Sequence, residues 1–228
     1  MINQAHFIFK NISSEDYLMV NKLPLITKAA KDIEKIEIEG RDGFLTIDKG
    51  SYKGTIKLVE CTIMNLEQLD FICSWLDGSG NVIFSNEPDK TYKATIINQI
   101  EFEKIAWVFH TLLIQFDCQP HKYSLANEVI ALQSAGTLYN SGTAISNPII
   151  KVFGTGDVDL NINGNIVSLT SVDEYVTIDS DLIDCYKDTV LKNNDMNGEF
   201  PILEIGNNSI SWIGTVSKIE ITPNWRWI

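Results

Sequence analysis

The sequence predicts a mainly β protein with two modules: an N-terminal β-barrel or β-sheet domain that carries one α-helix, and a C-terminal β-sandwich. Apolar and polar residues alternate over short stretches through most of the chain, which is the period of a strand. Only residues 65–77 repeat apolar side chains at three and four positions, which is the period of a helix. A stretch at 140–156, rich in Asn and Gly, separates the two patterns. We therefore predict domains at 1–136 and 137–228.

The composition is that of an acidic globular chain. Hydrophobic residues make up 44% of it, which argues against disorder, and no apolar run approaches the roughly 18 residues of a membrane span. The net charge of -12 is spread over both modules, with 13 Lys/Arg against 18 Asp/Glu in 1–136 and 5 against 12 in 137–228. Because neither half has a basic stripe, we expect no membrane partner and no specific DNA binding. The N-terminus lacks a signal-peptide pattern, so we expect synthesis and folding in the cytoplasm.

Short strands are expected along the first module. They are 7–9, 17–20, 33–39, 52–63, 82–84, 92–97, 100–104, 106–118 and 129–132, with turns at 40–43 and 87–90. In 52–63, Ile56 and Leu58 fall on one face and the odd-numbered residues from Lys57 to Ile63 on the other. The run 106–118 is apolar on both faces, which is typical of a central strand covered from both sides, and Pro120 should lie just beyond its end.

The predicted helix at 65–77 is amphipathic and should cover the apolar face of a sheet. Its apolar positions are Leu66, Leu69, Ile72, Cys73 and Leu76. Asn65 can cap the first turn with Gln68 reaching back to it, and Gly78 ends the helix.

The second module reads as a set of strands at the spacing of a sandwich. The first, 149–153, is a short apolar run closed by Gly154 and Gly156. Residues 157–169 alternate on either side of Asn163-Gly164, the pair favoured by a type I′ hairpin turn. The remaining expected elements are strands at 175–178, 202–205, 210–216 and 219–222, a loop at 193–198 and a turn at 206–208.

No pattern in the sequence indicates catalysis, so we predict that the protein is not an enzyme and needs no cofactor. His6, His110 and His121 are the available imidazoles, and none stands in a motif with a nucleophile or a carboxylate. His110 lies inside an apolar run and is more typical of a packed, hydrogen-bonded core residue.

No metal site is predicted either. A partial calcium-loop pattern is formed by Asp179, Ser180, Asp181 and Asp184. It lacks the central glycine and the terminal glutamate of an EF-hand, so a solvated acidic loop is the preferred interpretation. The cysteines are Cys61, Cys73, Cys118 and Cys185. They form no C-x-x-C pair, and we expect buried free thiols rather than disulfides or a zinc site.

Three tryptophans could offer an aromatic face to a sugar ring. Trp212 lies in an alternating strand and is expected to fill the core. Trp225 and Trp227 flank Arg226 near the end of the chain and remain the candidates for carbohydrate stacking, although aromatics at a terminus often pin the last strand instead.

A series of short motifs runs along nearly the whole chain. In the first half the motifs are Gly40-Arg41-Asp42-Gly43, the single helix from Asn65, and Phe116-x-Cys118-x-Pro120. In the second half they are Asn140-x-Gly142, Asn147-Pro148, Val152-x-Gly154-x-Gly156-Asp157, Leu160-x-Ile162-Asn163-Gly164, Ile178-Asp179-Ser180, Gly198-x-Phe200-Pro201, Gly206-Asn207-x-x-Ile210-x-Trp212 and Pro223-x-Trp225-Arg226. Their order and spacing resemble the distal tail protein (Dit) family of phages with long, non-contractile tails.

The resemblance implies an N-terminal β domain that assembles as a homo-hexameric ring, which can stack as two rings in isolation, and a galectin-like C-terminal sandwich on its outside. Such a ring sits at the distal end of the tail in the virion, joins the tail tube protein to the tail tip or baseplate proteins, and lets DNA pass through its channel. Longer members carry an inserted carbohydrate-binding or arm module. No such insertion is visible here, so direct host recognition by this chain is not expected.

A structural hub is therefore the leading hypothesis. The alternative is a carbohydrate-binding sandwich that contacts host cell-wall polysaccharide, based on the second module and its terminal tryptophans. An enzyme is a third option that no motif supports.

Overall fold

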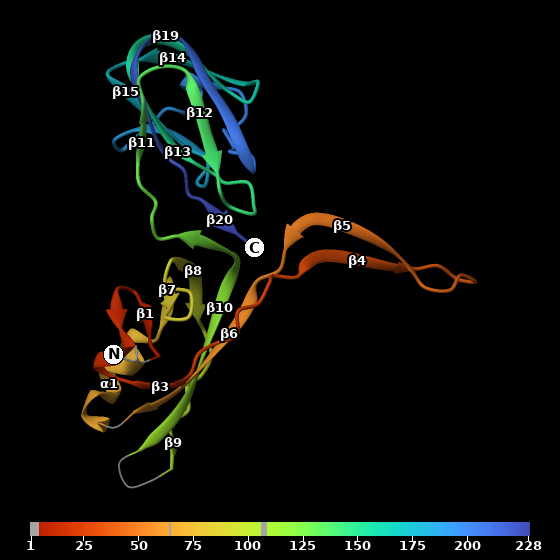
Figure 1. The fold of residues 1–228 in the computed structure, drawn as a ribbon, viewed down its shortest axis with the longest axis vertical. Coiled ribbons are helices and arrows are strands. Elements are labelled where there is room, and N and C mark those ends of the chain that lie inside the picture. Colours follow the sequence, from red (N-terminus) through yellow and green to blue (C-terminus); the bar gives the residue numbers. More distant parts are fainter. Residues whose placement is uncertain (1–4, 64, 106–108) are drawn as a thin grey trace. The chain divides into compact units, whose positions relative to one another are not determined.

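A computed structural model describes residues 5–63, 65–105 and 109–228. The chain is mainly β, as predicted, and divides into two compact units, Met1–Lys122 with Ile228 and Tyr123–Trp227 (Figure 1). Each unit has its own hydrophobic core. The division falls earlier in the chain than the expected boundary between 136 and 137, because residues 130–140 pair with a strand of the second unit.

The first unit is built on an antiparallel sheet. Its strands are β1 Phe7–Phe9, β2 Ile12–Ser13, β3 Met19–Lys22, β6 Thr55–Ile63, β7 Gly78–Phe84, β8 Lys90–Ile96, β9 Glu103–Lys104 and β10 His110–Ser124, with the 3₁₀ turn η1 Ser14–Asp16 between β2 and β3. Their order is β2-β1-β7-β8-β10-β6-β3, and β9 lies beside β10. The sheet therefore joins strands from both ends of this unit's sequence.

Aromatic rings fill the core of the first unit. Phe116 on β10 meets the rings of Phe7, Phe9 and Phe84 edge to face, at centroid distances of 5.4, 5.4 and 5.7 Å. Trp75 stacks on Phe7 at 5.6 Å, and its indole Nε1 donates a hydrogen bond to the Phe9 carbonyl at 2.9 Å. Such pairs contribute roughly 0.5–1.5 kcal/mol each beyond the apolar area they bury.

The described residues contain one α-helix, α1 Leu69–Trp75, which follows the 3₁₀ turn η2 Leu66–Gln68. The predicted cap is confirmed: Asn65 Oδ1 accepts the Glu67 backbone N–H at 2.9 Å. The predicted reciprocal bond from Gln68 to Asn65 is not found among the described residues. Gln68 is instead the N-cap of α1, without a side-chain cap bond. No helix in the described part of the chain is long and apolar enough to cross a membrane.

The buried side of the helical segment differs from the prediction. Ile72, Trp75 and Leu76 are buried, whereas Leu66 and Cys73 are exposed, and Trp75 was not among the predicted positions. The Trp75 hydrogen bond to β1 fixes which side faces inward, and Cys73 lies about 200° round the helix from Trp75. The prediction that all four thiols are buried is therefore wrong for Cys73.

The alternation predicted for β6 is confirmed. The odd-numbered residues from Lys57 to Ile63 are buried, and Ile56 and Leu58 are exposed. The strand begins later than predicted, at Thr55, because Tyr52 ends a separate strand.

The prediction for β10 is wrong in two respects, although residues 106–108 of the predicted strand lie outside the described residues. Only one face is covered within the chain, since Leu113 on the other face is exposed. Pro120 does not end the strand, which runs on to Ser124. The register with β6 stops at the pair Cys118–Thr55, so the missing N–H of Pro120 interrupts no hydrogen bond to that strand.

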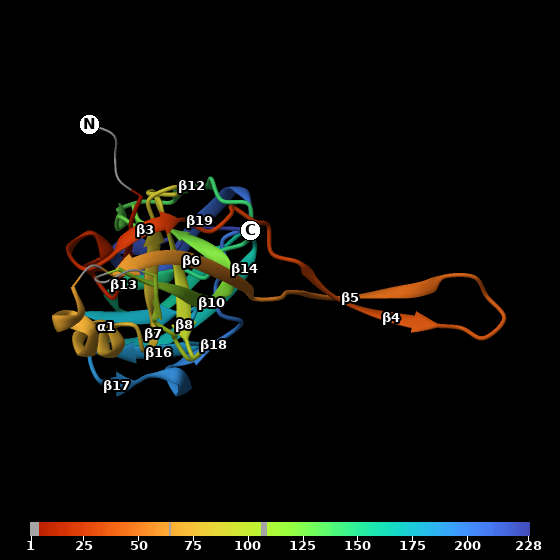
Figure 2. The same cartoon turned by 90° about the horizontal axis from the view of Figure 1, so that it is seen from below.

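Strands β4 Lys31–Glu37 and β5 Phe44–Tyr52 form a two-stranded sheet of their own. The predicted turn at 40–43 joins them, with Gly40 and Gly43 both at positive φ. Strand β5 was not predicted. Figure 2 shows the hairpin running out from the other strands of the first unit.

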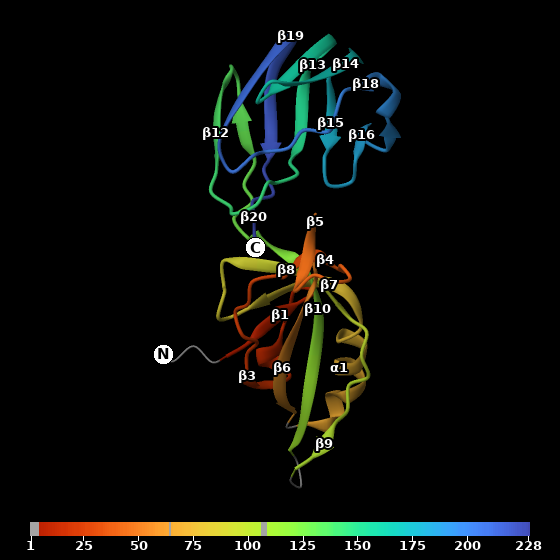
Figure 3. The ribbon, with the colours of Figure 1, turned by 90° about the vertical axis from the view of Figure 1, so that its right-hand side faces the viewer.

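The second unit holds another antiparallel sheet system (Figure 3). Its strands are β11 Ile130–Leu132, β12 Gly136–Asn140, β13 Ile149–Ile162, β14 Asn165–Val172, β15 Tyr175–Asp179, β16 Asp184–Lys187, β17 Val190–Leu191, β18 Met196–Asn197 and β19 Gly206–Thr222, with the 3₁₀ turn η3 Asn193–Asp195 before β18. The short strand β20 Arg226–Trp227 follows and pairs with β10 instead. The order is β11-β19-β13-β15-β16-β17; β12 pairs with β19, and β14 pairs with β13 and β18. Strand β12 was not predicted.

Strand β13 passes through the two glycines that were predicted to close it. The register shifts against β19 between Phe153 and Gly154 and again between Thr155 and Val158, so the glycines mark bulges instead of an end. A Cβ on Gly154 would lie 2.4 Å from the Thr215 carbonyl oxygen. The bulge therefore requires glycine at this position.

The hairpin turn predicted at Asn163-Gly164 is confirmed. Both residues have positive φ, 54° and 92°, and Ile162 pairs with Asn165 across the two-residue loop that joins β13 to β14. These are the requirements of a type I′ turn.

One continuous strand, β19, replaces the predicted turn at 206–208 and the predicted strands 210–216 and 219–222. The predicted strand at 202–205 is not formed, and Leu203 makes only an isolated bridge there. Asn208 explains part of the difference. Its buried side chain accepts the Glu204 N–H at 2.7 Å and donates to the carbonyls of Glu204 and Leu138. Tertiary hydrogen bonds thus use a residue whose local preference is for turns.

Candidate assembly surface

The β4–β5 hairpin exposes an apolar side that no residue of its own sheet covers. In the register, Ile36 pairs with Leu45, and Ile47 lies two residues further along the same side of β5. These three residues, here called the hairpin face, are 38 to 48% exposed. Ile38, just before the turn, is exposed as well.

The opposite side of the hairpin is more polar and partly covers itself. The Lys35 ammonium lies 4.3 Å from the centroid of the Phe44 ring, and Lys31 and Asp48 form an ion pair at 2.5 Å. An isolated two-stranded hairpin is at best marginally stable in water. The hairpin face is therefore the side on which a further layer would stabilise it.

A second exposed apolar surface lies on the outer side of the first unit's sheet. It consists of Ile56 and Leu58 of β6 and Leu113 of β10, here called the sheet face, which are 44 to 60% exposed. Each of the three pairs across the two strands with a polar residue. The polar partners are Glu60, Gln115 and Asp117. A groove lined by Leu23, Pro24 and Leu25 borders the same stretch of β6.

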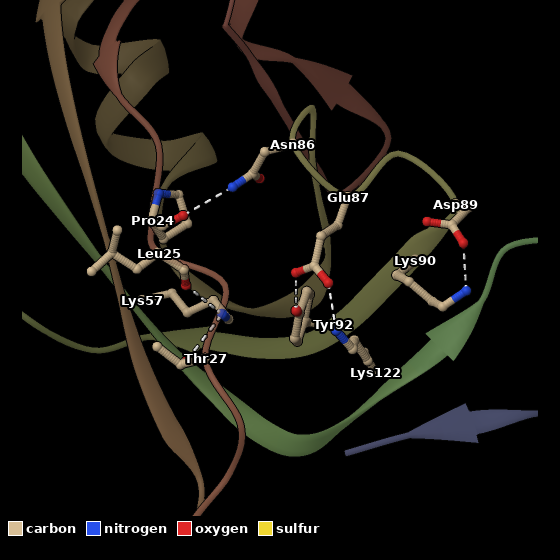
Figure 4. A network of polar contacts seen from close by, with 10 residues as sticks. All are labelled: Pro24, Leu25, Thr27, Lys57, Asn86, Glu87, Asp89, Lys90, Tyr92 and Lys122. Atoms are coloured by element: carbon tan, nitrogen blue, oxygen red, sulfur yellow. Dashed lines mark hydrogen bonds and ion pairs between the residues drawn. The ribbon is translucent and has the colours of Figure 1, made fainter. Parts of the chain in front are cut away.

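Residues 23–30, here called the root segment, lead from β3 into the hairpin and belong to no helix or strand. Side chains of the sheet hold this segment by its polar atoms (Figure 4). The Lys57 ammonium donates to the Leu25 carbonyl at 3.1 Å and to Thr27 Oγ1 at 3.5 Å, and Asn86 Nδ2 donates to the Pro24 carbonyl at 3.0 Å.

Lys57 is the more unusual of these groups, because its side chain is only 2% exposed. Its ammonium also lies 4.9 Å from the centroid of the Tyr92 ring. Burial lowers the pKa of Lys57, and the nearby Glu87 carboxylate opposes that shift. A buried cation is costly unless its protons are bonded, so the root segment supplies acceptors that Lys57 needs.

Glu87 completes the polar cluster from the turn between β7 and β8. It accepts hydrogen bonds from Lys122 Nζ, at 2.5 Å, and from the Tyr92 hydroxyl. Burial alone would raise the pKa of Glu87, but the bonds from Lys122 and Tyr92 outweigh it, and the pKa is lowered. Burial and the bond to Glu87 both raise the pKa of Tyr92. Glu87 is therefore held as a carboxylate between two lysines.

The predicted sugar-stacking residues lie in the second unit. Trp225 is half-buried and packs against the core of that unit, as Trp212 does, and its carbonyl accepts the Ser124 N–H. Trp227 is half-buried in β20. Both have a structural use, and carbohydrate stacking by Trp225 and Trp227 stays a prediction.

The second unit also has a hollow bordered by β14, β15 and β16 and lined in part by Tyr175, Lys187 and Asp173. The Lys151 ammonium lies 3.7 Å from the centroid of the Tyr175 ring, and the Tyr175 hydroxyl donates to Asp188. One face of the ring is thus already occupied by a cation.

The other candidate residues are dispersed. His6 lies 3.3 Å from Glu15, and His110 is buried as predicted, but its Nδ1 has no hydrogen-bond partner among the described residues. Asp179 Oδ1 accepts the backbone N–H groups of Asp181 and Leu182, which closes the acidic loop on itself. In the described part of the chain no group of three His, Cys, Asp or Glu side chains is placed to hold a metal ion.

Sequence reasoning missed the hairpin face because β5 was not predicted. The signal was present: Phe44 to Asp48 alternates directly after the 40–43 turn, and the preceding strand ends at that turn. A strand, a glycine-bounded turn and a second alternating stretch are the pattern of a hairpin.

No family model and no curated protein matches the sequence. Among solved structures, the chain is similar to the SPP1 Dit (gp 19.1) protein, described as a paradigm of the hub adsorption apparatus in phages that infect Gram-positive bacteria. The match covers 95% of this chain and 98% of that one, with a TM-score of 0.74 and 15% sequence identity. The likeness confirms the fold that the resemblance to the Dit family implies.

Proposed function

We propose that this chain is a structural hub protein of a phage tail, which assembles as a ring at the distal end of the tail. The observation that carries the proposal is the pair of uncovered apolar surfaces, the hairpin face and the sheet face, on a unit that is otherwise well packed. The fold shared with the SPP1 Dit protein over nearly the full length of both chains supports it.

The two surfaces differ from each other, which suits a head-to-tail contact. In our proposal the hairpin face of one copy packs on the sheet face and the adjoining Leu23–Leu25 groove of the next. A contact between two different surfaces repeats around an axis, and when the rotation between copies closes it forms a ring without unused ends. Fully burying an exposed Ile or Leu contributes roughly 1.5–3 kcal/mol, and each of these partly buried side chains contributes less than that, but three on each side still make a substantial contact.

The resemblance to the Dit family supplies the number six and the neighbours on either side. The ring joins the tail tube protein to the tail tip or baseplate proteins, and DNA passes through its channel without specific contacts. A net charge of -12 per copy suits a channel that does not bind a polyanion.

Light scattering coupled to size exclusion, with negative-stain images, tests this function. Six copies of 25.6 kDa give a mass of about 154 kDa, or twice that for two stacked rings. Because like charges meet at every interface, assembly should strengthen as salt shortens the screening length from its roughly 10 Å at 0.1 M. A monomer at every protein and salt concentration would overturn the proposal.

The carbohydrate-binding alternative keeps one supporting observation, the pair Trp225 and Trp227 close together near the end of the second unit. Calorimetric titration with host cell-wall polysaccharide tests it. Binding that Trp225→Ala abolishes while the thermal stability of the second unit is retained would favour this function, and heats of dilution alone would remove it.

A further inference from the structure

The root segment is attached to the first unit through side chains at two separate places in the sequence. Lys57 lies near the start of β6, and Asn86 lies in the turn after β7. Their targets are the consecutive carbonyls of Pro24 and Leu25, with Thr27 Oγ1 as a third acceptor. Pro24 is itself buried, so the attachment point is both packed and hydrogen-bonded.

The chain beyond this attachment has few other constraints before the hairpin. Leu25 and Ile26 are 75 and 59% exposed, and Ala29 is the next buried residue. The two hairpin strands meet where the Lys53 N–H donates to the Ala30 carbonyl at 2.8 Å. A segment without ladder hydrogen bonds is free to change direction unless side chains hold it.

We propose that Lys57 and Asn86 are positioning residues for assembly: they hold the root segment and so fix the direction in which the hairpin leaves the unit. This inference rests on the proposed ring, because a fixed direction matters only if the hairpin face must meet the next copy. A hairpin that is not held would sample many directions. The entropy lost on fixing it in one direction would then weaken each contact between copies.

The energetics favour a positioning role over a purely stabilising one. A buried lysine contributes little net stability, since the desolvation of its charge offsets most of what its hydrogen bonds gain. Asn86 is exposed as a residue, and its single bond contributes about 1 kcal/mol. Such groups are expected to affect the geometry of assembly more than the folding of the unit.

Two variants of the full chain test the inference. Lys57→Met keeps an unbranched side chain of nearly the same length and removes both hydrogen bonds of the ammonium, and Asn86→Ala removes the third bond. Asn81→Ala is the matched control, because Asn81 is an exposed asparagine on β7. For each variant, ring mass against concentration, thermal unfolding and hydrogen–deuterium exchange of residues 23–52 are measured.

We expect both variants to unfold within a few degrees of the parent, to exchange faster in the root segment and hairpin, and to need at least ten-fold higher concentration to form rings. The control should match the parent. Rings of unchanged stability in both variants would overturn the inference. If Lys57→Met fails to fold, Asn86→Ala decides alone.

The failure of the ring proposal is distinguishable from the failure of this one. A parent chain that stays monomeric overturns the proposed function. Hydrogen–deuterium exchange of the root segment then tests whether Lys57 and Asn86 hold that segment. Faster exchange at 23–30 in Asn86→Ala but not in Asn81→Ala supports the attachment, and equal exchange overturns it.

Discussion

The β4–β5 and β13–β14 hairpins share one local pattern, but only one of them has its apolar side covered. In the β13–β14 hairpin, Val158, Leu160 and Ile162 are at most 3% exposed, because the second unit's core covers them. In the β4–β5 hairpin, the equivalent apolar side is uncovered. Alternation thus specifies which side of a strand is apolar, but not whether the same chain supplies the cover.

The largest effect is expected when the hairpin face is made polar. We expect Ile36→Glu combined with Ile47→Glu to abolish ring formation and to leave a 25.6 kDa monomer with unchanged thermal stability, since the residues are already exposed. Light scattering and thermal unfolding are the measurements.

Thr46→Glu is the control, because Thr46 pairs with Lys35 on the opposite side of the hairpin. Rings that survive the double substitution would contradict the assignment of this face to assembly.

A matched pair of truncations compares the two hairpins directly. Leu160→Ala should destabilise the second unit by about 2–5 kcal/mol, because it leaves a cavity in a packed core. Leu45→Ala should cost the isolated monomer roughly 0.5 kcal/mol or less, as for an exposed residue. Exchange-monitored unfolding of each unit gives both numbers. Similar values would show that the monomer already covers the hairpin face.

A smaller effect is expected at the β13–β14 turn. Gly164 has a φ of 92° and no atom near the position of a Cβ, so Gly164→Val should cost roughly 1–2 kcal/mol through backbone strain alone. Gly164→Asn should cost less, because asparagine tolerates positive φ. Equal losses for valine and asparagine would argue for a steric cause. Ring formation by the first unit should persist in both variants.

The smallest effect concerns pH. Since the pKa of Glu87 is lowered in the folded unit, its stabilisation is present above the unfolded value of about 4.3 and is lost as pH falls toward the folded value. We expect Glu87→Gln to cost about 1 kcal/mol at pH 7, and we expect the difference in stability from the parent to shrink as pH falls below the unfolded value. A difference that persists unchanged at pH 3 would assign the effect to packing.

Much of the fold follows from local patterns. The mainly β class, the helix near 69–75, the alternation of β6 and the turn at Asn163-Gly164 are all readable because each depends on neighbours in sequence. The errors come from distant contacts. In sequence, a glycine that ends a strand cannot be distinguished from a glycine that forms a bulge within it. At Gly154 the distinction comes from the close approach of the Thr215 backbone.

The candidate surface was less predictable than the fold. Leu58 and Leu113 have the same residue type and period as their buried neighbours, and sequence cannot tell which face another strand or helix will cover. The burial of Lys57 could not be predicted either, since a lysine between apolar residues usually reaches solvent. Its burial depends on the root segment, which lies roughly thirty residues away in the chain.

The exposed Cys73 gives the native chain a site for thiol labelling. Cys61, Cys118 and Cys185 are buried, and burial raises their thiol pKa to about 12, about 12 and about 11, so they remain protonated and shielded near neutral pH. A maleimide dye should therefore modify one position per folded chain and four per unfolded chain. With mixed donor and acceptor dyes on α1, energy transfer would report the separation of neighbouring copies without any engineered cysteine.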